Sequence, residues 1–141
     1  MPNLYFVQHM PPAEHPAFFC SSRLTLNVTR QAMADYGFCP SGRLFEAASC
    51  GTPIITDTWE GLDSFFTPGT EILPAKTTSD VLDALSLSDV ELKRIAEAAR
   101  ARTLHKHTAE ARAQQLEDLC ASSTRATPKL TLPEHHSLAE M

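Results

Sequence analysis

The spacing of apolar residues along the chain changes between a period typical of strands and one typical of helices. The run RLTLNVTR, residues 23–30, places a leucine or valine at every second position, which predicts a half-buried strand with its apolar side chains toward the core. Residues 53–56 are apolar without alternation, which is typical of a parallel strand covered on both faces. Two more short strands are predicted at residues 4–7 and 71–73.

A capped helix is predicted from about Gly42 to Cys50. Proline cannot continue a helix from upstream, so Pro40 marks its start, and the Ser41 hydroxyl can accept a hydrogen bond from a first-turn amide. Gly51 can take the left-handed conformation that ends a helix. Further helices are expected near residues 16–21, 30–36 and 80–85, and after a capping box formed by Ser88 and Glu91.

The last predicted helices carry apolar stripes. Their members lie at helical spacing, and we expect both stripes to pack on the sheet: Leu92, Ile95, Ala96 and Ala99, then Ala109, Ala113, Leu116 and Cys120. Strands that alternate with helices imply a parallel α/β sheet, and such sheets bind ligands at the carboxyl ends of their strands. The turn at Ser41 should lie at that edge.

The start of the predicted 42–50 helix is a candidate anion site. The amides of Gly42, Arg43 and Leu44 have no helical partner, and the helix dipole favours negative charge there. Glu46 lies one turn further on, roughly 6 Å from the first free amide at ~1.5 Å rise per residue. A carboxylate at that separation could meet sugar hydroxyls while the amides hold a phosphate. The alternative is an i, i+3 surface ion pair between Glu46 and Arg43.

Composition narrows the classes of protein. The net charge of −5 over 141 residues argues against a general nucleic-acid binder, which needs a basic face. No apolar run approaches the ~20 residues of a membrane span, and the N-terminus lacks the pattern of a secretion signal. We therefore expect a cytoplasmic protein with neither nucleic acid nor membrane as partner.

A metal site is not expected. The four cysteines show no CxxC pair, so we expect them to be reduced and packed as small apolar residues: Cys20, Cys39, Cys50 and Cys120. His105 and His107 stand two positions apart, which on a helix points them away from each other, and they are expected at the surface.

The run SGRLFEAASCGTPIITDTWEGLDSFF, residues 41–66, with PGTEILPA after it, resembles the donor-binding C-terminal domain of GT-B glycosyltransferases. It is most similar to the branch related to the spore-maturation protein CgeB, and the resemblance covers roughly residues 3–120. It implies a Rossmann-like parallel sheet of about four strands flanked by helices, as a partial GT-B C-terminal domain over residues 1–120. Residues 121–141 are rich in Ser, Thr and Pro, and we expect a disordered tail there.

The resemblance also implies site residues. The counterpart of Glu46 binds the ribose hydroxyls of a nucleotide sugar, and the helix-start positions that face its diphosphate correspond to Ser41, Gly42, Arg43 and Leu44. Three residues lie at or just beyond the ends of predicted strands and could line the same cleft: Asn27, Arg30 and Asp57. For Asn27 and Arg30, turn and surface roles are the alternative. The nucleotide-diphosphate sugar is a substrate, no cofactor is implied, and no residue stands out as catalytic.

The chain departs from the GT-B pattern in two respects. Phe38 stands eight positions before Glu46, where many of these enzymes have a glutamate that contacts the donor sugar. The resemblance also covers neither the acceptor domain nor the first two strands of the donor domain. We therefore expect the donor-binding part of a glycosyltransferase with an unknown acceptor and little turnover alone. Alternatives are a non-catalytic nucleotide-binding or assembly subunit, or a truncated remnant without function.

Missing strands would leave a sheet edge open, and an open edge tends to recruit another strand. Three outcomes are predicted. The 4–7 and 24–28 strands pair directly, the chain forms a homodimer through that edge, or it needs its missing N-terminal domain.

Overall fold

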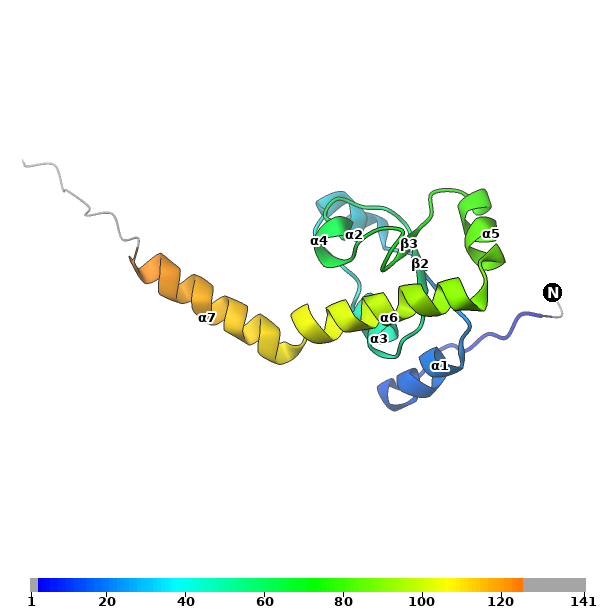
Figure 1. The fold of residues 1–141 in the computed structure, drawn as a ribbon, viewed down its shortest axis with the longest axis horizontal. Coiled ribbons are helices and arrows are strands. Elements are labelled where there is room, and N and C mark those ends of the chain that lie inside the picture. The colour runs from blue at the N-terminus through cyan, green and yellow to red at the C-terminus, as the bar shows by residue number, and fades with distance from the viewer. Residues whose placement is uncertain (1–2, 126–141) are drawn as a thin grey trace, which may run out of the picture. The chain divides into compact units, whose positions relative to one another are not determined.

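The computed structural model describes residues 3–125, which divide after Thr108 into two units. Figure 1 shows the elements of the first unit. In chain order they are the 3₁₀ turn η1 (Pro12–Glu14), α1 (His15–Ser21), β1 (Thr25–Asn27), α2 (Gln31–Tyr36), α3 (Gly42–Ser49), β2 (Ile54–Thr56), α4 (Leu62–Phe65), β3 (Leu73–Pro74), α5 (Thr78–Ser86) and α6 (Asp89–Lys106).

A parallel sheet of three strands, in the order β1-β2-β3, forms the centre of this unit. Thr25 pairs with Ile54, and Ile55 pairs with Leu73, both in parallel ladders. The predicted α/β class and parallel pairing are confirmed. The predicted strand at residues 4–7 is wrong, because that segment is irregular and exposed and has no neighbouring strand. Its direct pairing with β1 is therefore wrong as well.

The two faces of β1 are the reverse of the prediction. Asn27 and Thr29 are buried, whereas the side chains of Leu26 and Val28 are 52% and 63% exposed. Asn27 Nδ2 donates a hydrogen bond to Thr56 Oγ1 at 3.2 Å, so the polar face of β1 joins a polar network with β2. The alternation was read correctly, but hydrogen bonding places the polar side inward.

Helix α3 is the element around which the unit packs. Leu44, Ala47 and Ala48 have no exposed surface, and α3 contacts both β1 and β2. Gly51, with φ +72°, ends the helix by donating its amide to Ala48 O at 2.9 Å, as predicted. The helix closes at Ser49 with Cys50 as C-cap, one residue earlier than expected.

Helix α6 buries the predicted stripe, but against α3. Leu92, Ile95, Ala96 and Ala99 are all at most 3% exposed, and α6 packs along α3 rather than on the strands. Figure 1 shows α6 running across α3. The apolar stripe was therefore predicted correctly, but the prediction that it packs on the sheet was wrong, because α3 covers it.

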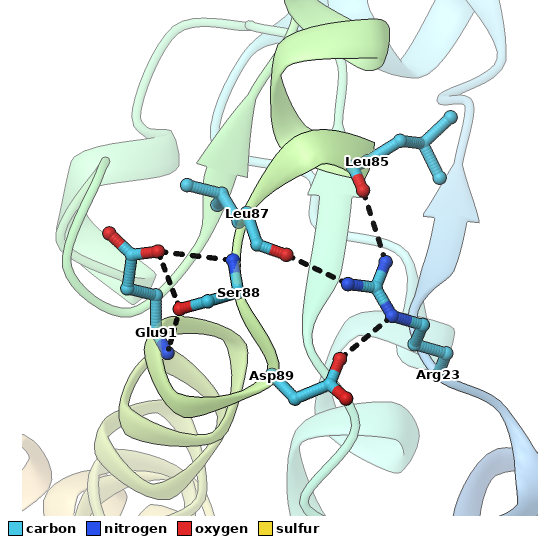
Figure 2. Close-up of polar contacts among 6 residues, drawn as sticks. All are labelled: Arg23, Leu85, Leu87, Ser88, Asp89 and Glu91. Atoms are coloured by element: carbon cyan, nitrogen blue, oxygen red, sulfur yellow. Dashed lines mark hydrogen bonds and ion pairs between the residues drawn. The ribbon is translucent and has the colours of Figure 1, made fainter.

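Figure 2 shows how the junction between α5 and α6 is fixed. Ser88 Oγ accepts from the Glu91 amide while the Glu91 carboxylate accepts from the Ser88 amide, which is the predicted capping box. Arg23, two residues before β1, donates to Leu85 O, Leu87 O and Asp89 Oδ1 at 3.1, 2.7 and 2.9 Å. One guanidinium thus joins β1 to the end of α5 and the start of α6.

The second unit contains helix α7 (Ala109–Arg125). All four residues of the second predicted stripe lie on this helix, and the packing of that stripe on the sheet stays a prediction. Residues 121–125, assigned to a disordered tail, are helical, and residues 126–141 lie outside the described part of the chain. None of the helices within residues 3–125 is long and apolar enough to cross a membrane.

Two predictions about burial, one for the cysteines and one for His107, need correction. Cys20 and Cys120 are exposed, so only Cys39 and Cys50 are partly buried as small apolar residues would be. His107 is half-buried and lies beside aromatic rings, with its ring centroid 5.0 Å from that of Phe45. Contact with aromatic rings, which spacing alone does not reveal, covers part of its side chain.

Candidate functional site

The start of α3 offers two free amides, not three. The Leu44 amide donates to Ser41 O at 3.1 Å, so it is occupied, and the Leu44 side chain is fully buried. Within residues 3–125, the amides of Gly42 and Arg43 have no hydrogen-bond partner. The Ser41 hydroxyl makes no cap bond and instead accepts from Arg43 Nε at 3.4 Å, which corrects the predicted N-cap role.

Arg43 and Glu46 line one open cavity of about 480 Å³. The rest of its lining is mostly apolar and comes from the N-terminal segment and α1: Tyr5, Phe6, Val7, Met10, His15, Phe18 and Phe19. The surface ion pair between Glu46 and Arg43 is not formed. The Glu46 carboxylate instead takes a hydrogen bond at 3.1 Å between its Oε2 and His15 Nδ1.

His15 is held on both sides of its ring. Its Nε2 lies 3.2 Å from the Met10 carbonyl oxygen, and its ring meets the ring of Phe19 edge-on at 6.3 Å between centroids. The imidazole therefore connects the irregular N-terminal segment with α3. The sequence pattern did not indicate His15, because it lies 31 positions from Glu46 and outside every predicted strand and helix.

Asn27 and Asp57 line a second groove, of about 300 Å³, at the carboxyl ends of the strands, together with Lys76 and Thr77. Asp57 Oδ1 accepts from the amide and hydroxyl of Thr29 at 2.9 and 2.8 Å, which ties the end of β1 to the end of β2. The Asp57 carboxylate therefore has a structural task. The sequence had predicted only that Asp57 lines the cleft.

Arg43 lies between the site residues predicted on α3 and those predicted at the strand ends. Besides the cavity that it lines with Glu46, Arg43 lines a cavity of about 150 Å³ together with Asn27, Thr25 and Phe19. Arg30 lines none of these three cavities and stands exposed at the N-cap of α2. The structure thus brings Arg43 and Glu46 together, places Asn27 within reach of Arg43, and leaves Arg30 apart.

Phe38, at the position where a GT-B glutamate was expected, has an unusual backbone. Its φ of +48° lies in the left-handed region, and its amide donates to Glu60 O at 2.6 Å. Gly61 makes this possible, since a Cβ there would lie 2.3 Å from Phe38 Cδ1. The loops before α3 and before α4 therefore interlock beside the start of α3.

Cys50 lies one helical turn after Glu46. Burial and the neighbouring Cys20 thiol raise the pKa of Cys50, so its thiolate is disfavoured. Cys20 Sγ lies 3.8 Å from Cys50 O. Among the described residues, no group of three or more His, Cys, Asp or Glu side chains is placed to hold a metal ion.

A parallel sheet of three strands flanked by helices places the first unit among the α/β proteins. A family model described as glycosyl transferase-like matches residues 2–118, and the chain belongs to that family. No curated protein matches the sequence.

A solved structure, sucrose-phosphate synthase from Thermosynechococcus elongatus, has a similar fold, with a TM-score of 0.57 at 18% identity. The alignment covers 78% of this chain and 27% of that one. The fold is therefore that of a GT-B-type glycosyltransferase fragment, and the chain spans about a quarter of the synthase.

Proposed function

We propose that this chain is the donor-binding part of a CgeB-like glycosyltransferase that moves a sugar from a nucleotide diphosphate to an unknown acceptor. Membership in the glycosyl transferase-like family and the GT-B fold support the class of reaction. The observation that carries the site assignment is the meeting of Arg43 and Glu46 at one cavity beside two free amides.

In this proposal the start of α3 holds the diphosphate. The free amides of Gly42 and Arg43 and the positive end of the helix dipole favour an anion. The Arg43 guanidinium, whose one hydrogen bond within residues 3–125 is the long one to Ser41, can turn toward the same charge. These groups would stabilise the leaving diphosphate as the glycosidic bond breaks, without an obligatory metal.

Glu46 would hold the ribose. Its Oε2 is engaged by His15, while its Oε1 has no partner within residues 3–125 and can accept from a hydroxyl. Asn27 and Asp57, on the adjoining groove, are the next candidates for ligand contact, and Arg30 is the weakest.

We propose further that turnover needs an acceptor-binding partner. The open edge of β1, with Leu26 and Val28 exposed, would receive either an acceptor-binding domain or a second copy of the chain in a cytoplasmic enzyme. A non-catalytic nucleotide-binding subunit would use the same site and differ only in lacking turnover.

Isothermal titration calorimetry tests the site. Uridine diphosphate, as a probe, should bind the chain more tightly than uridine, because the amides and Arg43 contact only the diphosphate. Glu46→Ala should raise the dissociation constant of uridine diphosphate about 5–50-fold, the loss expected for one or two hydrogen bonds to a charged group.

The matched control is Glu97→Ala, which removes an exposed carboxylate from α6 that pairs only with Lys93. Binding should be unchanged in that variant. Equal affinity of the wild-type chain for uridine and its diphosphate would overturn the phosphate role of the helix start.

A further inference from the structure

The carboxylate of Glu46 forms a hydrogen bond with a histidine from another helix. His15 Nδ1 lies 3.1 Å from Glu46 Oε2, and the two side chains retain 32% and 47% of their exposure. A carboxylate on a helix surface is otherwise free to rotate about three side-chain bonds. This contact selects one orientation of the Glu46 carboxylate.

The imidazole can act as a fixed support because it is itself restrained. Its Nε2 lies 3.2 Å from Met10 O, and the Phe19 ring, which is 5% exposed, contacts it edge-on. Both ring nitrogens therefore have a polar partner, one on α3 and one on the N-terminal segment, so the ring is not free to turn.

We propose that His15 is the positioning residue of the donor site: it holds Glu46 Oε2 so that Oε1 is presented to the ribose diol of the nucleotide. This inference rests on the proposed function and adds the residue that orients its carboxylate. The chain segment that carries Met10 and His15 thereby becomes part of the nucleotide site.

A fixed carboxylate should distinguish ribose from deoxyribose, which a freely rotating carboxylate does less well. The measured quantity is the ratio of the dissociation constants of 2′-deoxyuridine diphosphate and uridine diphosphate. In the wild-type chain the ratio should be about 5–20, which corresponds to one hydrogen bond of roughly 1–2 kcal/mol. Glu46→Ala should bring the ratio to about 1.

His15→Leu should lower the ratio to about 1–3 while leaving the preference for diphosphate over nucleoside in place. His15→Asn, whose side-chain amide can donate from near the Nδ1 position, should restore part of the ratio. The matched control is His105→Leu, an exposed histidine on α6. A general loss of folding would weaken both nucleotides equally and leave the ratio unchanged.

The outcomes separate this inference from the proposed function. A wild-type chain that does not prefer uridine diphosphate to uridine contradicts the proposed function. A wild-type ratio retained in His15→Leu but lost in Glu46→Ala overturns the role of His15 alone.

A ligand-free measurement tests the contact itself. The ¹⁵N chemical shift of His15 Nδ1 at neutral pH should move in Glu46→Gln and stay in place in Glu97→Gln. An unchanged shift in Glu46→Gln overturns the inference, whatever the nucleotide does.

Discussion

At the scale of single residues, the decisive contacts join positions far apart in the sequence. His15 meets Glu46 across 31 positions, and Thr29 meets Asp57 across 28. The sequence pattern indicated Glu46 because a capped helix and a following Gly-x-Pro strand surround it. No periodicity indicates His15, since its role depends on where α1 lies against α3. Local signals therefore reveal one half of such a pair and miss the other.

The contact between Phe38 and Gly61 leads to a residue-scale prediction. Gly61→Ala should lower the free energy of unfolding by about 2–4 kcal/mol, because alanine at φ +90° costs ~1–2 kcal/mol and its Cβ displaces the Phe38 ring at a further cost of ~1–2 kcal/mol. Urea unfolding followed by circular dichroism measures the change.

Gly69→Ala is the control for that measurement. Gly69 also has a left-handed φ, of +77°, yet a Cβ there would meet nothing within 4 Å. Gly69→Ala should therefore lower the free energy of unfolding only by the cost of the left-handed backbone. In a Phe38→Ala background, Gly61→Ala should lower the free energy of unfolding by no more than Gly69→Ala does. Equal losses in the two glycine variants of the otherwise wild-type chain would show that the ring is not in the way.

At the scale of elements, most helices were predictable because their end signals are local. Gly51 ends α3, and Ser88 with Glu91 begins α6, in each case through bonds within a few residues. The strands were less predictable. Residues 4–7 have a strand-like composition, but a strand needs a neighbour. Likewise, β1 turns its polar face inward because Thr56 and Asp57 supply hydrogen-bond partners that only β2 brings near.

The capping boxes predict how stability depends on pH. Hydrogen bonds from Ser88 lower the pKa of Glu91, and the backbone amides of Lys76 and Thr77 lower that of Asp80. A carboxyl group whose pKa is lower in the folded state adds stability above its unfolded pKa of ~4, and this stability is lost as pH falls through the folded pKa. Glu91→Gln should therefore be less stable than wild type at pH 7, with the difference shrinking by pH 3.

Urea unfolding of both chains at pH 7, 5 and 3 checks this expectation. Glu97→Gln, on the same helix but outside the cap, is the control and should follow the wild-type profile. A stability difference for Glu91→Gln that is the same at all three pH values would contradict a contribution from the charged cap shown in Figure 2.

At the scale of the whole molecule, the glycosyl transferase-like family and the GT-B-type fold follow from the order of elements over residues 2–118. The sequence also indicated the half of the site that lies on α3. It could not indicate the N-terminal wall of the cavity, because Tyr5 and Phe6 reach Arg43 through the course of an irregular segment. Irregular segments follow no period that a sequence pattern could reveal.

The edge of the sheet predicts self-association. Thr25 donates its amide to Pro53 O at 2.9 Å, so the backbone groups of Leu26 face away from β2, next to two exposed apolar side chains. In size-exclusion chromatography with light scattering, the fraction of dimer should rise with the concentration of the purified chain. The double variant Leu26→Thr with Val28→Thr should shift it at least several-fold toward monomer.

Leu104→Thr with Val90→Thr is the matched control, because it removes the same two residue types from exposed positions on α6. That variant should associate as the wild type does. A wild-type chain that stays monomeric at high concentration would rule out the homodimer at this edge.

The parallel register has a consequence for how fast the protein can fold. Thr25 pairs with Ile54, 29 positions away, and Ile55 with Leu73, 18 positions away, so neither ladder can begin as a hairpin. Each requires a long loop to close before any strand contact forms, and chains with such non-local contacts fold slowly. The helix α3, which contacts both β1 and β2, must dock early if the two strands are to meet. The helix that carries the proposed donor site would then also set the folding rate.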